Sequence, residues 1–389
     1  MLPKKKKKIV FLGTMPLTER DYLRFGFNFL IKSDYEVYYL ECNFLITGDS
    51  LNESYFSQIR FHYPGNLAPK NVKEAVFLIN KYKFEFVVDL FDLIQDGEAI
   101  VVAARSYGKH IKLRLGSIPF HFLKPIRTDK IKRLQQELER PLKFMVKLIR
   151  KINRINFNKT TIQNQADYYI VSGLKSCQGI EPNKIIYCHN FDYDLIEDEK
   201  YCNKGYIVFL DEDMPFHIDY SYFNVTPPVT PENYYFSVNT FLRVFGEFRK
   251  EQVLVSLHPR AEFNRSLAMF QFEIIQGDTV DLVKGASMVI AHSSTSIQLA
   301  VIFKKPILLL TTNEIEKSLD VQAAIDSFKI ELGCTVINTD KSYCLNDLKL
   351  EIDEEKYNKF FDNYIKSPMS EKNKKIWEIF LDHTTRVQI

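Results

Sequence analysis

The chain has 389 residues, of which 46% are hydrophobic and 26% charged, and its formal net charge is +3. A chain of this length is too long for one ordinary core and predicts two domains of roughly 150–200 residues each. The near-balanced charge argues against a dedicated nucleic-acid-binding protein. The six cysteines contain no C-x-x-C pair and no histidine at zinc spacing, so neither a disulfide framework nor a metal site is predicted.

The N-terminal part of the chain begins with a strand, a glycine turn and a helix. The apolar run Ile9–Leu12 follows the basic residues Lys4–Lys8 and is too short for a signal peptide or a membrane span. With its reduced cysteines, the chain is therefore expected to be cytoplasmic. The turn at Gly13-Thr14 precedes a helix predicted over about Thr18–Ile31, which is the start of a βαβ unit.

Further segments continue this alternation, which predicts a parallel sheet with helices on both faces. The predicted strands are Tyr35–Glu41, Phe84–Leu90, His110–Leu115, Asp167–Ser172 and Lys184–Tyr187, and the predicted helices are Val72–Tyr82 and Gly97–Tyr107.

Residues 121–160 form a basic and amphipathic segment. They contain twelve Lys or Arg residues and three Asp or Glu residues, a local excess of nine positive charges, interleaved with apolar residues. Pro141 is expected to divide the segment into two helices. Such a segment suits the anionic inner face of a membrane, which would make the protein a peripheral membrane protein. The alternative is that the apolar side packs on the N-terminal sheet while the charges are solvated.

A polar stretch is the predicted boundary between two halves of the chain. It comprises the loop-like Asn190–Asp194 and residues 197–204, after which Tyr206–Leu210 begins a second α/β half. The predicted domains are residues 1–200, residues 205–340 and a C-terminal helical segment at 341–389. The second half and the tail are predicted to contain helices at about Glu232–Phe248, Leu319–Phe328 and Glu371–Leu381 and strands at Lys305–Leu310 and Thr335–Ile337.

Two motifs in the second half each follow a short apolar strand. His258-Pro259 follows Val253–Leu257, and Ser293-Ser294-Thr295-Ser296 follows Met288–Ala291 and precedes a helix at Ile297–Ile302. Ligands of open α/β sheets bind at the carboxyl ends of strands, and Ser or Thr at a helix start suits a phosphate. Each motif alone also fits a structural role, because Ser and Thr are ordinary helix caps and His-Pro is an ordinary strand exit.

A third motif is acidic. Asp211, Glu212 and Asp213 follow the first strand of the second half, with His217 close behind. Carboxylates at this place could supply a general base or a nucleophile for sugar transfer, and Asp211 is the first candidate because it lies closest to the strand end. A solvated turn that caps a helix is the alternative.

Two weaker candidates lie in or next to the N-terminal half. Asn190 and Asp192 lie at the predicted crossover between domains, where they could meet a ligand or simply form Asx turns in a linker. The turn at Gly13-Thr14 would allow close approach of an acceptor sugar, although it is not a G-x-G-x-x-G fingerprint.

The order of the motifs, acidic cluster, His-Pro pair and hydroxyl run, resembles that of bacterial sialyltransferases and Kdo transferases of the GT-B fold, which use CMP-activated sugars. The resemblance implies that His258 and Ser293–Ser296 contact the donor phosphate and that a residue of Asp211–Asp213 serves the reaction. In the sialyltransferases the acidic motif ends in Gly, whereas Met214 follows here, so the resemblance does not identify the catalytic carboxylate. Phe209–His217 and Pro16–Arg20 also resemble capsule and surface-polysaccharide biosynthesis proteins.

We therefore predict an α/β protein with two Rossmann-like domains facing a cleft, as in GT-B enzymes, followed by C-terminal helices. The N-terminal domain would be the acceptor side and the second domain the donor side. The resemblance implies transfer of a nonulosonic acid (sialic, pseudaminic or legionaminic) or Kdo from a CMP-sugar to a surface polysaccharide or lipid-linked glycan, with no metal and no cofactor. The alternatives are a UDP-sugar glycosyltransferase or epimerase on the same fold, or a non-catalytic polysaccharide-assembly protein.

Overall fold

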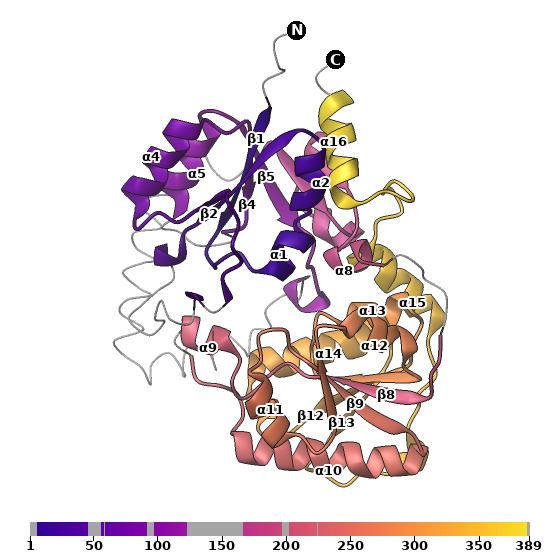
Figure 1. The fold of residues 1–389 in the computed structure, drawn as a ribbon. Coiled ribbons are helices and arrows are strands. Elements are labelled where there is room, and N and C mark those ends of the chain that lie inside the picture. The colour runs from indigo at the N-terminus through magenta and orange to yellow at the C-terminus, as the bar shows by residue number, and fades with distance from the viewer. Residues whose placement is uncertain are drawn as a thin grey trace.

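The computed structural model describes residues 6–45, 56–57, 59–91, 97–122, 166–196, 202–223 and 225–386. These residues form two α/β domains, each built on a parallel sheet (Figure 1), which confirms the predicted fold class. The basic segment lies almost entirely outside the described residues, and with it the predicted membrane contact. Within the described part of the chain, no helix is both long and apolar enough to cross a membrane.

The first domain contains a seven-stranded sheet in the order β3-β2-β1-β4-β5-β6-β7. All of its paired strands run parallel, as the alternation of strands and helices predicts. The short strand β3 was not predicted, because it has only two residues. The strands are β1 Lys7–Gly13, β2 Tyr35–Glu41, β3 Asn66–Leu67, β4 Phe86–Asp89, β5 Lys109–Arg114, β6 Tyr168–Val171 and β7 Ile185–Tyr187, and the helices α4 Val72–Tyr82 and α5 Glu98–Arg105.

The helix predicted over Thr18–Ile31 is wrong in one respect, because it is broken into α1 (Glu19–Arg24) and α2 (Phe27–Lys32). Gly26 lies between them with φ of 63°, a left-handed conformation that glycine adopts easily. A Cβ at Gly26 would lie 2.2 Å from Cδ1 of Trp377, so the close packing of that indole also requires glycine. The sequence pattern could not show this, since Trp377 is far away along the chain.

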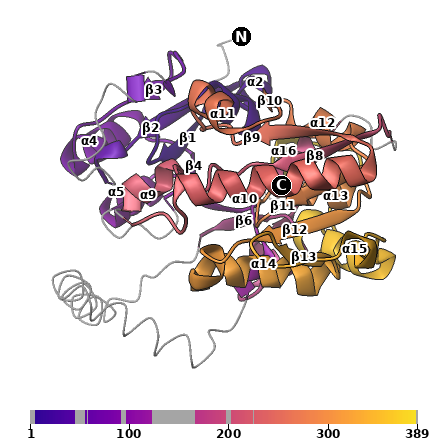
Figure 2. The same ribbon diagram turned by 90° about the horizontal axis from the view of Figure 1, so that it is seen from below.

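The second domain contains a six-stranded parallel sheet in the order β10-β9-β8-β11-β12-β13. The helix α10 (Pro231–Arg249) lies along this sheet (Figure 2). The segment between β9 and β11 adds one strand and two helices that were not predicted, because its apolar runs are very short. The strands are β8 Tyr206–Leu210, β9 Gln252–Leu257, β10 Glu273–Gln276, β11 Met288–Ala291, β12 Ile307–Thr311 and β13 Thr335–Asn338, and the remaining helices α9 Ile218–Phe223, α11 Phe263–Met269, α12 Thr279–Gly285, α13 Ile297–Ile302 and α14 Leu319–Leu332.

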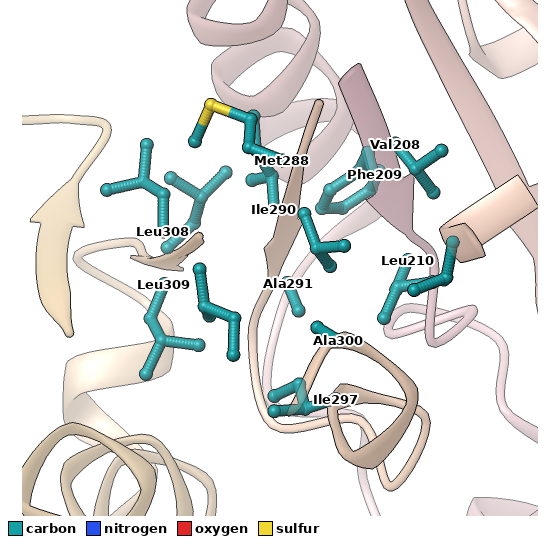
Figure 3. Close-up of a cluster of buried hydrophobic side chains, with 14 of the residues drawn as sticks. Val208, Phe209, Leu210, Met288, Ile290, Ala291, Ile297, Ala300, Leu308 and Leu309 are labelled. Atoms are coloured by element: carbon teal, nitrogen blue, oxygen red, sulfur yellow. The ribbon is translucent and has the colours of Figure 1, made fainter. Parts of the chain in front are cut away.

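The central strands of this sheet are buried on both faces. Every residue of β11 and β12 is buried, as their continuous apolar sequences predict for parallel strands covered by helices. Figure 3 shows Phe209, Ile290 and Leu308 from three neighbouring strands packed with Ile297 of α13. The core therefore fixes both the strand ends and the start of α13.

Described residues flank two connections between the domains. The first crossing contains α8 (Phe191–Asp194), a short helix where the sequence predicted a loop-like linker. That prediction was wrong because the Oδ1 atom of Asn190 accepts a hydrogen bond from the N–H of Tyr193 at 2.7 Å and caps the helix. After α15 (Glu354–Phe360) the chain crosses back, and α16 (Ile376–Arg386) packs on the first domain (Figure 1).

Candidate functional site

Three strand ends of the second sheet meet at one edge. β8 lies between β9 and β11, and Phe209 is in register with Val255 on one side and Ile290 on the other. Because the strands are parallel, the residues that follow them emerge at the same edge of the sheet. The structure thus brings together the three predicted motifs, Asp211–Asp213, His258-Pro259 and Ser293–Ser296.

Glu212 and the hydroxyl run contact each other directly. The backbone N–H of Ser293 donates to Oε1 of Glu212 at 2.6 Å, and the Ser293 hydroxyl donates to Oε2 at 3.1 Å. Burial raises the pKa of Glu212, and the donors of Ser293 partly offset this effect. A carboxylate of the chain itself therefore occupies the two donors of Ser293, which the sequence analysis assigned to a phosphate.

The remaining hydroxyl residues lead into α13. The Ser294 hydroxyl accepts a hydrogen bond from the N–H of Ser296 at 3.2 Å, and Ser296 makes no side-chain cap of the helix. Thr295 is exposed, and Ser294 and Ser296 are half-buried. The side chains of Ser294, Thr295 and Ser296 are thus more accessible to solvent than those of α13, which are all buried.

Asp211 is the most perturbed carboxyl of the cluster. It is 4% exposed, and neither of its carboxylate oxygens has a well-aligned hydrogen-bond partner among the residues that the structure describes. Burial, together with the negative charge of Asp213, raises its pKa to about 7, although nearby backbone N–H groups of Asp213 and His258 oppose the shift. Asp211 can therefore gain or lose a proton near neutral pH, as a general acid or base must.

Asp213 has a structural partner. Both of its carboxylate oxygens accept hydrogen bonds from Nη2 of Arg265, at 2.9 and 2.7 Å. The guanidinium of Arg265 also lies over the ring of Phe216, 4.2 Å from its centroid. Asp213 has φ of 48°, a left-handed conformation that Asp and Asn tolerate better than most residues. This carboxylate is therefore committed to an ion pair that fixes the turn after β8.

His258 lies beside a second imidazole. Its ring centroid is 4.6 Å from that of His217. Burial, then the charges of His217, Arg260 and Arg20, lower the pKa of His258 to about 3, so the ring is neutral at pH 7. The N–H of Arg260 donates to Nδ1 of His258 at 3.2 Å, which places the ring proton on Nε2. Nε2–H is thus a donor available to a ligand.

Two guanidinium groups and a second imidazole lie in the surroundings of His258. Arg260 is exposed and bonds Asp219 at 3.1 Å, and Arg20 belongs to α1 of the first domain. The N–H of Asp219 donates to Nδ1 of His217 at 3.3 Å, and burial lowers the pKa of that imidazole. The guanidinium groups of Arg260 and Arg20 therefore offer positive charge to an anionic ligand beside the two imidazoles. Pro259 is exposed, and its carbonyl accepts a hydrogen bond from Nε2 of Gln276 at 3.4 Å.

The candidates in or next to the first half contact other residues of the chain. A Cβ at Gly13 would lie 1.8 Å from the hydroxyl of Tyr39, which donates to the carbonyl of Met15 at 2.8 Å. Thr14 is half-buried beside it. Asn190 caps α8, and Asp192 lies 3.8 Å from Nη2 of Arg24.

Sequence reasoning missed several residues of this region because they lie far from the motifs along the chain. Arg265 belongs to α11, a helix that was not predicted. Gln298 contacts the first domain from α13, whose other residues are all apolar. His292 is buried, accepts from the Tyr234 hydroxyl at 3.0 Å and contacts the carbonyl of Leu310 at 2.8 Å. Within the described ranges no group of His, Cys, Asp or Glu side chains could hold a metal ion.

Two parallel-sheet α/β domains in one chain are the architecture of the GT-B class of fold. No family model and no curated protein match the sequence. Among solved structures, the wall teichoic acid polymerase TagF with CDPG is similar, with a TM-score of 0.51 and 12% identity over 99% of this chain and 90% of that one.

Two further structures are similar at lower TM-scores. The Methanocaldococcus jannaschii UDP-GlcNAc 2-epimerase in complex with UDP-GlcNAc and UDP has a TM-score of 0.48 and 15% identity over 98% of this chain and 100% of that one. S. aureus MnaA with UDP has a TM-score of 0.47 and 14% identity over 98% and 97%. At these identities the likeness concerns the fold alone.

Proposed function

We propose that this protein is a GT-B-type glycosyltransferase that takes a sugar from a nucleoside diphosphate donor, with UDP-sugars as the first donors to test. One observation carries the proposal. Asp211, a buried carboxyl with a pKa of about 7, lies at the same sheet edge as His258, whose Nε2–H is available. Sugar transfer from a phosphate leaving group requires one group that takes up a proton and another that binds the anion. Asp211 and His258 would fill these two roles.

The charges around His258 support a diphosphate. The imidazole of His258 and the guanidinium groups of Arg260 and Arg20 offer more donors than one phosphate needs. In the reaction, the bond between the anomeric carbon and the phosphate oxygen breaks, and the nucleoside diphosphate leaves with the electron pair. The acceptor hydroxyl forms the new bond and loses its proton to a base, for which Asp211 is the first candidate. His258 Nε2–H would stabilise the charge that develops on the phosphate.

The CMP-sugar donor implied by the motif order gains no support from the similar structures, whose names mention CDPG, UDP-GlcNAc and UDP. Binding of CMP is therefore included in the test. A surface polysaccharide or lipid-linked glycan remains the proposed acceptor, and the anionic inner membrane surface a proposed partner.

The test is nucleotide binding by calorimetry and thermal shift, with UDP, CDP, GDP and CMP. A nucleotide that binds only the folded protein at about 100 times its Kd adds about 2.7 kcal/mol of stability. We expect UDP or CDP to bind more tightly than CMP. Binding should be about 10- to 100-fold weaker in His258→Ala and unchanged in His62→Ala, an exposed histidine of the first domain. Absence of binding by every nucleotide would refute the proposal.

Product analysis then separates transfer from epimerisation. Incubation with the bound nucleotide's sugar conjugate should release nucleotide only when an acceptor is present. If the sugar is instead converted without an acceptor, the protein is an epimerase on the same fold.

A further inference from the structure

Gln298 joins the second domain to the first. It is the second residue of α13, two positions after Ser296, and is only 2% exposed. Its Nε2 donates to the carbonyl of Ser117 at 3.0 Å, and its Oε1 accepts a hydrogen bond from Nδ2 of Asn190. Both partners belong to the first domain. One buried amide therefore bonds two separate segments of the other domain.

Asn190 connects this amide to both chain crossings. Its Oδ1 caps α8 in the first crossing, and its N–H donates to the carbonyl of Ile365 at 2.8 Å. Ile365 ends the short π-helix Phe361–Ile365, which precedes the return of the chain to the first domain. The two crossings and the start of α13 thus meet at the pair Asn190 and Gln298.

Gln298 is equally tied to the hydroxyl run. Its backbone N–H donates to the carbonyl of Thr295 at 3.2 Å, and the N–H of Ile297 donates to the carbonyl of Ser294 at 3.1 Å. All six residues of α13 are buried, so the helix cannot tilt without disturbing the core. A change in the angle between the domains therefore reaches the turn that begins at Ser293 through Gln298.

We infer that Gln298 is a positioning residue that fixes the angle between the two domains. At this angle His258 and the hydroxyl run Ser293–Ser296 face the first domain, and Gln298 thereby sets the affinity for the donor nucleotide. The inference rests on the proposed function for its ligand. Apparent affinity equals the intrinsic affinity multiplied by the fraction of molecules in the competent arrangement, so loosening this contact weakens binding without touching the nucleotide. A buried amide with a purely structural role would change stability alone.

Two variants remove the contact in different ways. Gln298→Leu removes both hydrogen bonds at similar volume. Asn190→Ser removes only the bond to Gln298, because Ser still caps a helix well. Gln271→Leu, at an exposed glutamine of the same domain, is the matched control. If Gln298→Leu fails to fold, Asn190→Ser still tests the inference.

The first measurement needs no nucleotide. Amide hydrogen exchange of residues 293–302 and small-angle scattering are compared for the full chain and the three variants. We expect faster exchange and a larger radius of gyration in Gln298→Leu and Asn190→Ser but not in the control. If both variants match wild type in exchange and radius, Gln298 does not fix the domain angle and the inference is wrong.

The second measurement is calorimetry with UDP, CDP and CMP. We expect the dissociation constant to rise about ten-fold in Gln298→Leu and less in Asn190→Ser, a ten-fold change being about 1.4 kcal/mol. Loosened domains with unchanged affinity would overturn the link to binding. If wild type binds no nucleotide, the proposed function fails, while the nucleotide-free measurement still decides whether Gln298 positions the domains.

Discussion

The carboxylate of Glu212 accepts hydrogen bonds from both the backbone N–H and the hydroxyl of Ser293, at 2.6 and 3.1 Å. These two residues are 81 positions apart, and their strands are neighbours in the sheet. Through this contact Glu212 of the acidic cluster fixes the turn at Ser293 of the hydroxyl run, so the two motifs share a structural role. A donor phosphate would then be met first by His258 and by the side chains of Ser294 and Thr295.

We predict that Glu212→Leu lowers the free energy of unfolding by about 1–3 kcal/mol, since it leaves the partly buried N–H of Ser293 without the carboxylate that it bonds. Glu212→Gln should cost much less, because its amide can accept from the N–H and donate to the hydroxyl oxygen. Urea denaturation measures both, with the exposed Glu351→Gln as control. Equal stability of Glu212→Leu and wild type would show that the contact contributes nothing.

Loss of phosphate contacts should weaken nucleotide binding without unfolding the protein. We expect His258→Ala, and separately the double variant Ser294→Ala/Thr295→Ala, to raise the dissociation constant roughly 10- to 100-fold, the range for one hydrogen bond to a charged group. Calorimetry checks the affinity, and the melting temperature should stay near that of wild type. Unchanged affinity in both would place the phosphate site elsewhere.

Asp211 should make stability depend on pH. Its pKa is raised from 3.8 in the unfolded chain to about 7 in the fold, so the folded state retains a proton that the unfolded chain releases. The contribution of Asp211 to stability is therefore fully present below about pH 4 and is lost as pH rises to about 7, a change on the order of 4 kcal/mol. Denaturation from pH 4 to 8 should show a shallower fall in Asp211→Asn, and the wild-type fall in the exposed control Asp34→Asn.

Turnover identifies the catalytic carboxylate. At saturating donor we expect Asp211→Asn to lose roughly 10²–10⁴-fold in rate, the usual cost of losing a general base. Asp213→Asn should instead lose stability, because its partner Arg265 is left without a counter-charge. Each variant is checked for melting and nucleotide binding. If Asp211→Asn and Glu212→Gln both turn over within a few fold of wild type, the base lies elsewhere, and the first domain is the place to search.

Gly13→Ala distinguishes a packing role from contact with an acceptor. The added methyl would lie 1.8 Å from the Tyr39 hydroxyl, so we expect a loss of stability of about 1–3 kcal/mol from overpacking. Thermal denaturation measures it. A stable variant with weakened acceptor affinity would support the sugar-contact interpretation of Gly13-Thr14 instead.

The sequence by itself determined the fold class and the strands that carry the site. β8 and β11 could be predicted because strands buried on both faces need continuous apolar residues, and that pattern is local. The placement of Asp211 and His258 at one sheet edge also followed, since each motif ends such a strand. These statements depend only on neighbours along the chain.

Only the tertiary structure decided what each polar group contacts. The bonds of Glu212 to Ser293, of Asp213 to Arg265 and of Gln298 to the first domain join residues that are 52 to 181 positions apart. The packing of Trp377 against Gly26 likewise breaks a helix that the local pattern predicts as continuous. Such contacts depend on how the two domains and the segments between them pack. The local periodicity of the sequence carries no information on this packing.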